Sequence, residues 1–174
     1  MENRFKRHSF IKHNNKKKIL NEVHVHCGRI YTPSLPTHLS NTDPPIPLTS
    51  VEIRSLKKIK NPIVKINYSC VIPLTQRRRI KRFKFIFRLV RKEKNKNPVN
   101  LNEWELSQLF IEVLNLNEYV RVPFVIQYCD ESHTFNDTKV IYEIQLAEVS
   151  LRNASYKIID KGFSALVSSN VNHF

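Results

Sequence analysis

A short segment near the N-terminus carries residue types that bind metals: His24, His26 and Cys27. Imidazole and thiolate groups are zinc ligands, but a zinc site needs four well-placed donors, and no second His/Cys pair follows at the spacing of a zinc finger. If this segment is a strand, the two histidines share one face and Cys27 points to the other, because successive side chains alternate. We therefore expect ordinary strand residues here, with no metal and no cofactor.

Cys129 could form a nucleophilic pair with a histidine, because such partners need only meet in space. No carboxylate pair, catalytic triad or metalloprotease motif stands out beside it. A cysteine at the end of a strand with no catalytic role is the favoured interpretation, and the sequence predicts a protein that is not an enzyme.

The chain has three cysteines, an odd number, so at least one thiol is unpaired within a monomer or shared between chains. Cys70 has the parity of Tyr68 in an alternating apolar segment, which predicts a buried packing residue. Cys129 has the opposite parity to Ile126, which predicts exposure, and Cys27 lies next to the N-terminal segment. If an intersubunit disulfide forms in an oxidising environment reached after synthesis, we expect it to join Cys27 to Cys129.

Positive charge is the other unusual feature, since 29 Lys and Arg against 15 Asp and Glu give a net charge of +14. Such a field favours an acidic protein or a polyanion such as nucleic acid, in which phosphate contacts would dominate. Two alternatives would give the charge no binding role. The basic residues could form the solvated face of a strand with a basic turn, or the composition of the chain could simply favour Lys, Asn and Ile. The candidate polyanion-binding residues are Arg77, Arg78, Arg79, Lys81, Arg82, Lys84, Arg88, Arg91 and Lys92.

Several classes of protein are excluded by composition. The chain has only two glycines, so neither a P-loop nor a dinucleotide-binding glycine motif can be written in it. No apolar run is long enough to span a bilayer, and no apolar segment of a secretory signal follows the basic N-terminus. We expect synthesis in the cytoplasm.

Residues 82–89 give the clearest secondary-structure signal. Phe83, Phe85, Phe87 and Leu89 alternate with mostly basic residues, which is the pattern of a strand with one buried face. Three aromatic rings on one face need a second layer to cover them. This strand is therefore expected in the middle of a sheet that packs on another sheet, with its cations facing solvent or a partner.

Other short segments alternate in the same way. Residues 102–114 fit helical spacing as well as a bent strand, and we favour a strand because the neighbouring segments are strands. A tight turn is expected at residues 160–162, where Gly162 separates two strand-like segments. The further predicted strands are residues 23–28, 51–55, 64–72, 121–128, 140–146, 155–159 and 163–167.

Strands that recur every dozen or so residues predict an all-β fold, a two-sheet antiparallel sandwich of the jelly-roll kind. The expected organisation is a basic flexible arm at 1–21, a short strand and proline-rich connector at 22–49, the sandwich at 50–169 and a tail at 170–174. The proline-rich connector is expected to be extended.

The order of short motifs resembles an uncharacterised domain family of spore-forming clostridia and their relatives, over roughly residues 23–168. The motifs are Cys27-Gly28, a strand opening with Asn61-Pro62 (Val64, Ile66), the strand of Phe83, Phe85 and Phe87, a strand ending in Cys129-Asp130 (after Phe124), Tyr142-Glu143, and Ser164 to Val167. Members of the family resemble small cysteine-bearing β-sandwich proteins. Family members usually carry further cysteines where this chain has residues 131–134, so a local disulfide or metal cluster is in doubt there.

The resemblance implies no enzymatic activity. In architecture the chain is also similar to the jelly-roll subunits of spore surface layers and appendages, in which an N-terminal arm docks on a neighbouring subunit. We expect a structural subunit that forms a homo-oligomer or filament through its arm and cysteines, plausibly at the spore surface after assembly in the mother cell. The alternative is a polyanion-binding protein that uses residues 77–92.

Overall fold

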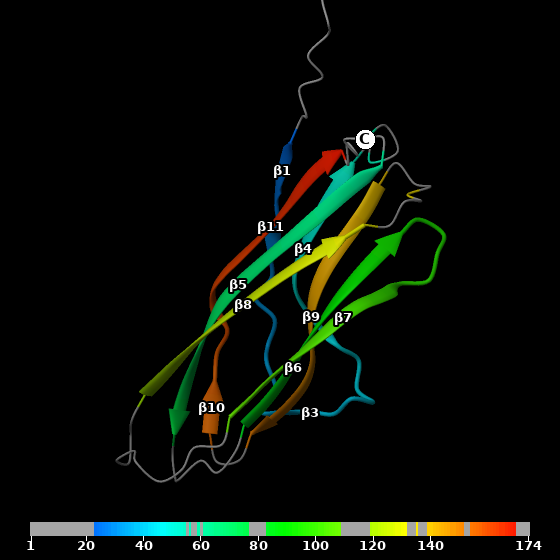
Figure 1. Ribbon diagram of the computed structural model, residues 1–174. Helices are drawn as coiled ribbons and strands as arrows, with labels where there is room; N and C mark the ends of the chain where they lie inside the picture. The colour runs from blue at the N-terminus through cyan, green and yellow to red at the C-terminus, as the bar shows by residue number, and fades with distance from the viewer. Residues whose placement is uncertain are drawn as a thin grey trace, which may run out of the picture.

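The protein, seen here as a computed structural model, consists of two antiparallel β-sheets packed face to face (Figure 1). The structure describes residues 23–54, 56, 59, 61–76, 83–108, 119–131, 135, 139–151 and 154–169. Within these residues there is no α-helix, so the prediction of an all-β sandwich is confirmed. No helix in that part of the chain has the length and apolarity that a membrane span needs.

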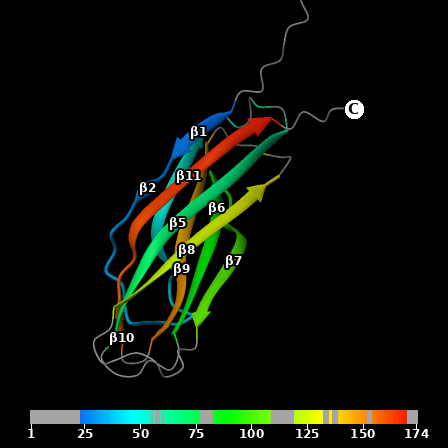
Figure 2. The ribbon, with the colours of Figure 1, turned by 60° about the vertical axis from the view of Figure 1, so that its left-hand side comes forward.

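The first sheet, sheet A, contains the first and the last strand of the described residues, β1 and β11, together with β5, β8 and β10. Its order is β1–β11–β5, with β8 on the other side of β5 and the short β10 continuing from β11 along β5. Figure 2 shows β1, β11, β5 and β8 lying side by side. The bounds are β1 His24–Cys27, β5 Pro62–Gln76, β8 Tyr119–Asp130, β10 Ala154–Tyr156 and β11 Ile159–Ser169.

The second sheet, sheet B, has the order β2–β4–β9–β6–β7, with the short β3 also paired to β9. Its long central strands, β6 and β9, pair in antiparallel register with one shift between Ile86 and Phe87. The bounds are β2 Arg29–Ile30, β3 His38–Leu39, β4 Ile46–Arg54, β6 Phe83–Glu93, β7 Val99–Gln108 and β9 Lys139–Leu151.

The core lies between the sheets and contains the three phenylalanines of the central strand. Phe83, Phe85 and Phe87 are fully buried, and Phe87 stacks on Phe124 of β8 in the opposite sheet with ring centroids 4.4 Å apart. Alternate residues of β5 and β9 complete this core. The prediction that these rings point inward between two layers is confirmed.

The segment before the predicted start of the sandwich is paired into both sheets. β1 pairs with β11 of sheet A, and β2 pairs with β4 of sheet B after a crossing at Gly28. The backbone N–H of Gly28 donates to the carbonyl oxygen of Phe163 at 2.7 Å, and a Cβ on Gly28 would lie 2.7 Å from Cδ1 of the Phe163 ring. Only a residue without a side chain fits this close approach.

One predicted turn is wrong, and one ambiguous segment is settled in part. Residues 160–162 lie inside β11, where a register shift against β5 accommodates Asp160 at a φ of 51°. The Gly162 signal therefore marks an irregularity within a strand, which short polar residues and glycine also permit. The expected strand at 102–114 is present as β7 up to Gln108, and residues 109–114 lie outside the described part.

Candidate assembly surfaces at the sheet edges

The predicted cationic face of β6 exists, but its cations are paired with carboxylates of the neighbouring strands. Nζ of Lys84 lies 3.0 Å from a carboxylate oxygen of Glu148 on β9 and 3.9 Å from one of Glu105 on β7. Nε of Arg88 lies 2.6 Å from Glu103 on β7, and Nζ of Lys92 lies 2.7 Å from Glu143 on β9. This part of the face is a pattern of alternating charges, which weakens it as a surface for polyanions. Arg77, Arg78, Arg79, Lys81 and Arg82 lie outside the described residues.

Arg91 does not belong to that face. It has the parity of Phe83 to Leu89, so its side chain points between the sheets, where Nη1 donates to Asp130 at 2.8 Å. The Tyr142 hydroxyl donates to the same carboxylate oxygen, also at 2.8 Å, and the Arg91 guanidinium lies 5.4 Å from the centre of the Phe135 ring. Burial disfavours the charged guanidinium, but Asp130 outweighs this effect and raises the pKa of Arg91. Through these contacts Arg91 and Tyr142 of sheet B are joined to Asp130 at the end of β8 in sheet A.

The three cysteines have different surroundings, as expected. Cys70 is buried at 3 % exposure, and burial raises the pKa of its thiol. Cys27 and Cys129 are exposed, and all three are free thiols. Cys27 lies opposite Ser164, which lies opposite Asn67, and Cys129 lies opposite Lys65 on the same strand as Asn67.

These pairings place both exposed thiols on the outer face of sheet A, at its two opposite edges. β1 and β8 are separated by β11 and β5, which is about 14 Å at the usual strand spacing. A disulfide requires Cα atoms within about 7 Å. Cys27 and Cys129 of one copy therefore cannot bond to each other without unfolding the sheet, whereas thiols of two copies can.

The molecule has two long sides, which we call the β1 edge (β1, β2 and β4) and the β8 edge (β7 and β8). Among the described residues, β1 and β8 each pair on one side only, and so does β7. Trp104 of β7 and Tyr128 of β8 contact each other edge to face, with centroids 6.2 Å apart, which holds the two strands of the β8 edge together.

The large hydrophobic side chains that remain exposed gather on these edges. They are Val23, Val25 and Ile30 at the β1 edge and Val99 and Val125 at the β8 edge. An unpaired strand with exposed apolar residues is a template for pairing with another chain, and monomeric proteins usually block it. Pro123 in β8 is one such block, but it lies toward the far end of that strand from Cys129.

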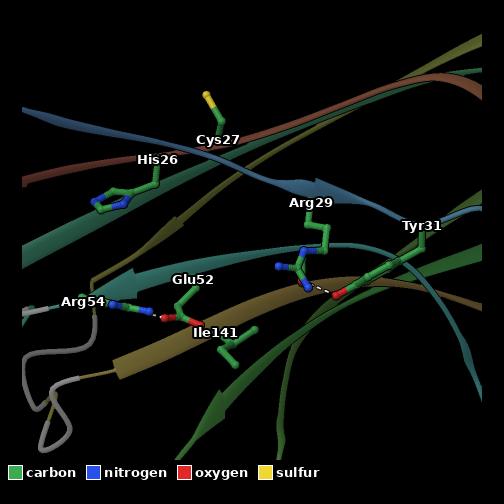
Figure 3. A pocket seen from close by; sticks show the side chains of 8 residues that line it. His26, Cys27, Arg29, Tyr31, Glu52, Arg54 and Ile141 are labelled. Atoms are coloured by element: carbon green, nitrogen blue, oxygen red, sulfur yellow. Dashed lines mark hydrogen bonds and ion pairs between the residues drawn. The ribbon is translucent and has the colours of Figure 1, made fainter.

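A groove of about 590 Å³ lies at the β1 edge, lined by residues of β1, β2, β4 and β9 (Figure 3). Its lining includes Arg29 of β2 and Ser50 and Arg54 of β4, and the Tyr31 hydroxyl lies 2.6 Å from Oγ of Ser50. The other lining residues are His26, Cys27, Glu52 and Ile141.

Glu52, the only carboxylate among the residues that line this groove, is already paired with two cations. Glu52 lies 2.6 Å from Lys139 and 2.7 Å from Arg54, and hydrogen bonds from both lower the pKa of its carboxyl. Burial, with a smaller contribution from His24, lowers the pKa of His26, and in Figure 3 the Cys27 side chain points away from His26. The groove is thus a basic surface, and nothing in its lining pairs a nucleophile with a base.

No group of three or more metal-binding side chains occurs among the residues that the structure describes. His24 and His26 lie on the inner parity of β1 and Cys27 on the outer one, as the alternation predicted.

A family model described as a domain of unknown function (DUF4489) matches residues 21–167. The chain belongs to the DUF4489 family. The matched region runs from before β1 into β11, so both edges of the sandwich are part of the DUF4489 domain. No curated protein matches the chain.

Sequence reasoning missed the carboxylates that neutralise β6 and the groove of the β1 edge. Glu103 and Glu105 stand two residues apart in a strand-like segment, and this spacing alone puts them on one face. Which cations they meet depends on the β6–β7 register, which contains a shift between Leu89 and Val90. The groove forms because β1 and β2 pair with different sheets, and no local pattern encodes that crossing.

Proposed function

We propose that this DUF4489 protein is a non-catalytic structural subunit that assembles with copies of itself into an oligomer or filament. The observation that carries the proposal is the position of its two exposed thiols, on one face and at opposite edges, where they can join copies but not each other. The unpaired strands and exposed valines at the same two edges support it.

The outer face of sheet A also supports assembly. Apart from Lys65, Arg121 and Asp160, the residues that point outward from β1, β11 and β5, and from β8 between Arg121 and Cys129, are small, amide-bearing or apolar. Such a face contrasts with the ion-paired outer face of sheet B and imposes little desolvation cost on contact.

The proposed setting is the surface of a bacterial spore, with synthesis in the cytoplasm of the mother cell. The resemblance to spore-former proteins motivates this setting, and the arm at 1–21 would contact a neighbouring subunit by strand addition. Oxidation of Cys27 and Cys129 would follow synthesis, since cytosolic thiols stay reduced.

Light scattering with and without reductant tests the proposal. We expect a mass well above 20.6 kDa that grows with concentration, and bands above the monomer on electrophoresis without reductant. A monodisperse monomer of 20.6 kDa at millimolar concentration, with or without an oxidant, would refute assembly.

A second candidate, polyanion binding, is favoured by the net charge of +14. Because the β6 cations are paired, this activity would rest on Arg77, Arg78, Arg79, Lys81 and Arg82. Retention of RNA or DNA on a filter at low salt, lost when these five are replaced by Gln, is the expected result. Retention that survives the replacement would assign binding elsewhere.

A further inference from the structure

The strand directions of sheet A allow the sheet to continue from one copy into the next. β1 is antiparallel to β11, β11 to β5, and β5 to β8, so β1 and β8 run in opposite directions (Figure 2). If a second copy in the same orientation places its β1 beside β8 of the first, the new pair is antiparallel, like every other pair in the sheet. No inversion of the second copy is needed.

Side-chain parity brings the two thiols together in this arrangement. In a continued sheet, Cys27 and Cys129 point to the same outer face, because each lies in the outward rows of its own copy. The row through Cys27 in one copy reaches Gln127 on β8, so a shift of two residues sets Cys129 opposite Cys27 of the next copy. A two-residue shift leaves every side chain on its own face, whereas a shift of one residue would bury the polar ones.

The pairing uses a part of β8 that can accept a new strand. β1 has only four residues, and with Cys27 opposite Cys129 the antiparallel register sets His26 opposite Asp130, the last residue of β8, so the stretch of β8 that pairs with β1 is short and the disulfide supplies much of the link. Pro123 lies outside this stretch, so its missing N–H does not interrupt the new hydrogen bonds.

Sheet B presents opposite charges on the two sides. The β1 edge carries Arg29 in its groove, together with Arg54, which is paired with Glu52 but has a side chain 79 % exposed, and the β8 edge carries Glu103 and Glu105 on β7. The side chains of Glu103 and Glu105 are 40 % and 47 % exposed even with their β6 partners in place. When the β8 edge of one copy meets the β1 edge of the next, these groups approach, whereas like edges would face like charges.

We infer that the partner of this subunit is a second copy bound head to tail, with β8 of one copy paired to β1 of the next and Cys129 bonded to Cys27. The inference rests on the proposed function and specifies its interface. Because the two surfaces differ, each added copy exposes a new β8 edge, and the assembly is open rather than closed as a dimer.

The disulfide forms with a small-molecule disulfide as oxidant. The Cys27 thiolate attacks it, giving a mixed disulfide and releasing one small thiolate. The Cys129 thiolate of the neighbouring copy then attacks the Cys27 sulfur of the mixed disulfide, which forms the Cys27–Cys129 bond and releases the second small thiolate. Two protein thiols are oxidised, one small disulfide is reduced to two thiols, and the protein protons pass to the released thiolates.

Two single-cysteine replacements, Cys27→Ser and Cys129→Ser, test this interface. Both side chains are exposed, and Cys70 stays in place because it is buried. Circular dichroism is used first to check that both variants keep the strand content of the wild type. Oxidised glutathione is added to the wild type, to each variant alone, and to an equimolar mixture in which one variant carries a mass tag.

We expect the wild type to give a ladder without reductant, each variant alone to lose the ladder, and the mixture to give one mixed dimer. Mass spectrometry of that dimer should find the peptide pair Cys27–Cys129. Dimers of one variant alone as abundant as the mixed dimer, or a wild type that stops at the dimer, would overturn the head-to-tail interface. If one of these contrary results is found and the reduced wild type still associates in light scattering, only this interface is refuted; if the reduced wild type is monomeric as well, assembly itself is refuted.

Discussion

Gly28 lies where the chain leaves sheet A for sheet B, and its missing side chain allows that crossing. A Cβ there would lie 2.7 and 2.8 Å from two side-chain carbons of Phe163 and 3.0 Å from its carbonyl oxygen. Phe163 is buried, so it has little room to move. We expect Gly28→Ala to lower the free energy of unfolding by about 1–3 kcal/mol, the usual cost of overpacking.

The other glycine of the chain supplies the matched control. A Cβ on Gly162 would meet only Oγ of Ser69, at 3.0 Å, on an exposed side chain that can rotate away. Urea unfolding of both variants should therefore show a clearly larger loss for Gly28→Ala than for Gly162→Ala. Equal losses would mean that backbone freedom, and not the contact with Phe163, decides the effect.

Cys70 should make the protein less stable in alkali. Burial raises the pKa of its thiol above the ordinary value of 9.0, so above that pH the unfolded chain loses this proton while the folded one keeps it. The contribution to stability is complete below pH 9.0 and is lost as the pH rises toward the folded pKa. Thermal melting on both sides of pH 9.0 measures the loss, and Cys70→Ala should make the dependence shallower. An unchanged dependence would assign it to buried tyrosines such as Tyr68 and Tyr142, whose pKa values are also raised by burial.

Among the contacts between elements, the Arg91–Asp130 pair is a buried ion pair that joins sheet B to β8. Asp130 is 3 % exposed, so removing it leaves a guanidinium buried beside Glu93 with one partner fewer. We expect Asp130→Ala to cost up to about 3–5 kcal/mol of unfolding free energy, since breaking a buried pair leaves the Arg91 charge less well compensated and removes the acceptor of the Tyr142 hydroxyl. Glu103→Ala is the control: it breaks the more exposed pair with Arg88 and should cost less than about 1 kcal/mol. Equal costs, measured by denaturant unfolding, would show that Arg91 finds other partners.

The sequence could predict where most strands lie and which face of each strand is buried, because the alternation of apolar and polar residues is a local property. The parity of Phe83, Phe85 and Phe87 fixed which face of β6 is buried, and that of Cys70 and Cys129 fixed their exposure. The same parity, extended to residue 91, places Arg91 on the buried face with the phenylalanines. The prediction that Arg91 belongs to the cationic surface was wrong because it followed from the charge of the residue and not from its position in the strand. Partner strands, the register shift beside Gly162 and the ion pairs of β6 depend on contacts between distant segments, which no local pattern contains.

For the whole molecule, two electrostatic effects act on assembly in opposite directions. Each copy carries a net charge of +14, which repels other copies over the full Debye length, about 30 Å at 0.01 M salt and about 8 Å at 0.15 M. The attraction between the groove arginines and the β7 glutamates acts at contact, where salt screens it less. Charge complementarity should therefore orient the copies, and strand pairing with apolar edge contacts should hold them.

Salt should accordingly strengthen association of the reduced protein, because it screens the repulsion more than the contacts. We expect the mass from light scattering to rise as sodium chloride is raised from about 0.01 M to 0.15 M, the range over which the Debye length shortens most. Polyanion binding has the opposite sign, since counterion release makes affinity for nucleic acid fall steeply with salt. The same titration in the presence of a single-stranded oligonucleotide therefore separates the two candidate functions within one sample series. A mass that falls with salt when no oligonucleotide is present would mean that ion pairs supply most of the binding energy, and strand addition at the β1 and β8 edges would lose its support.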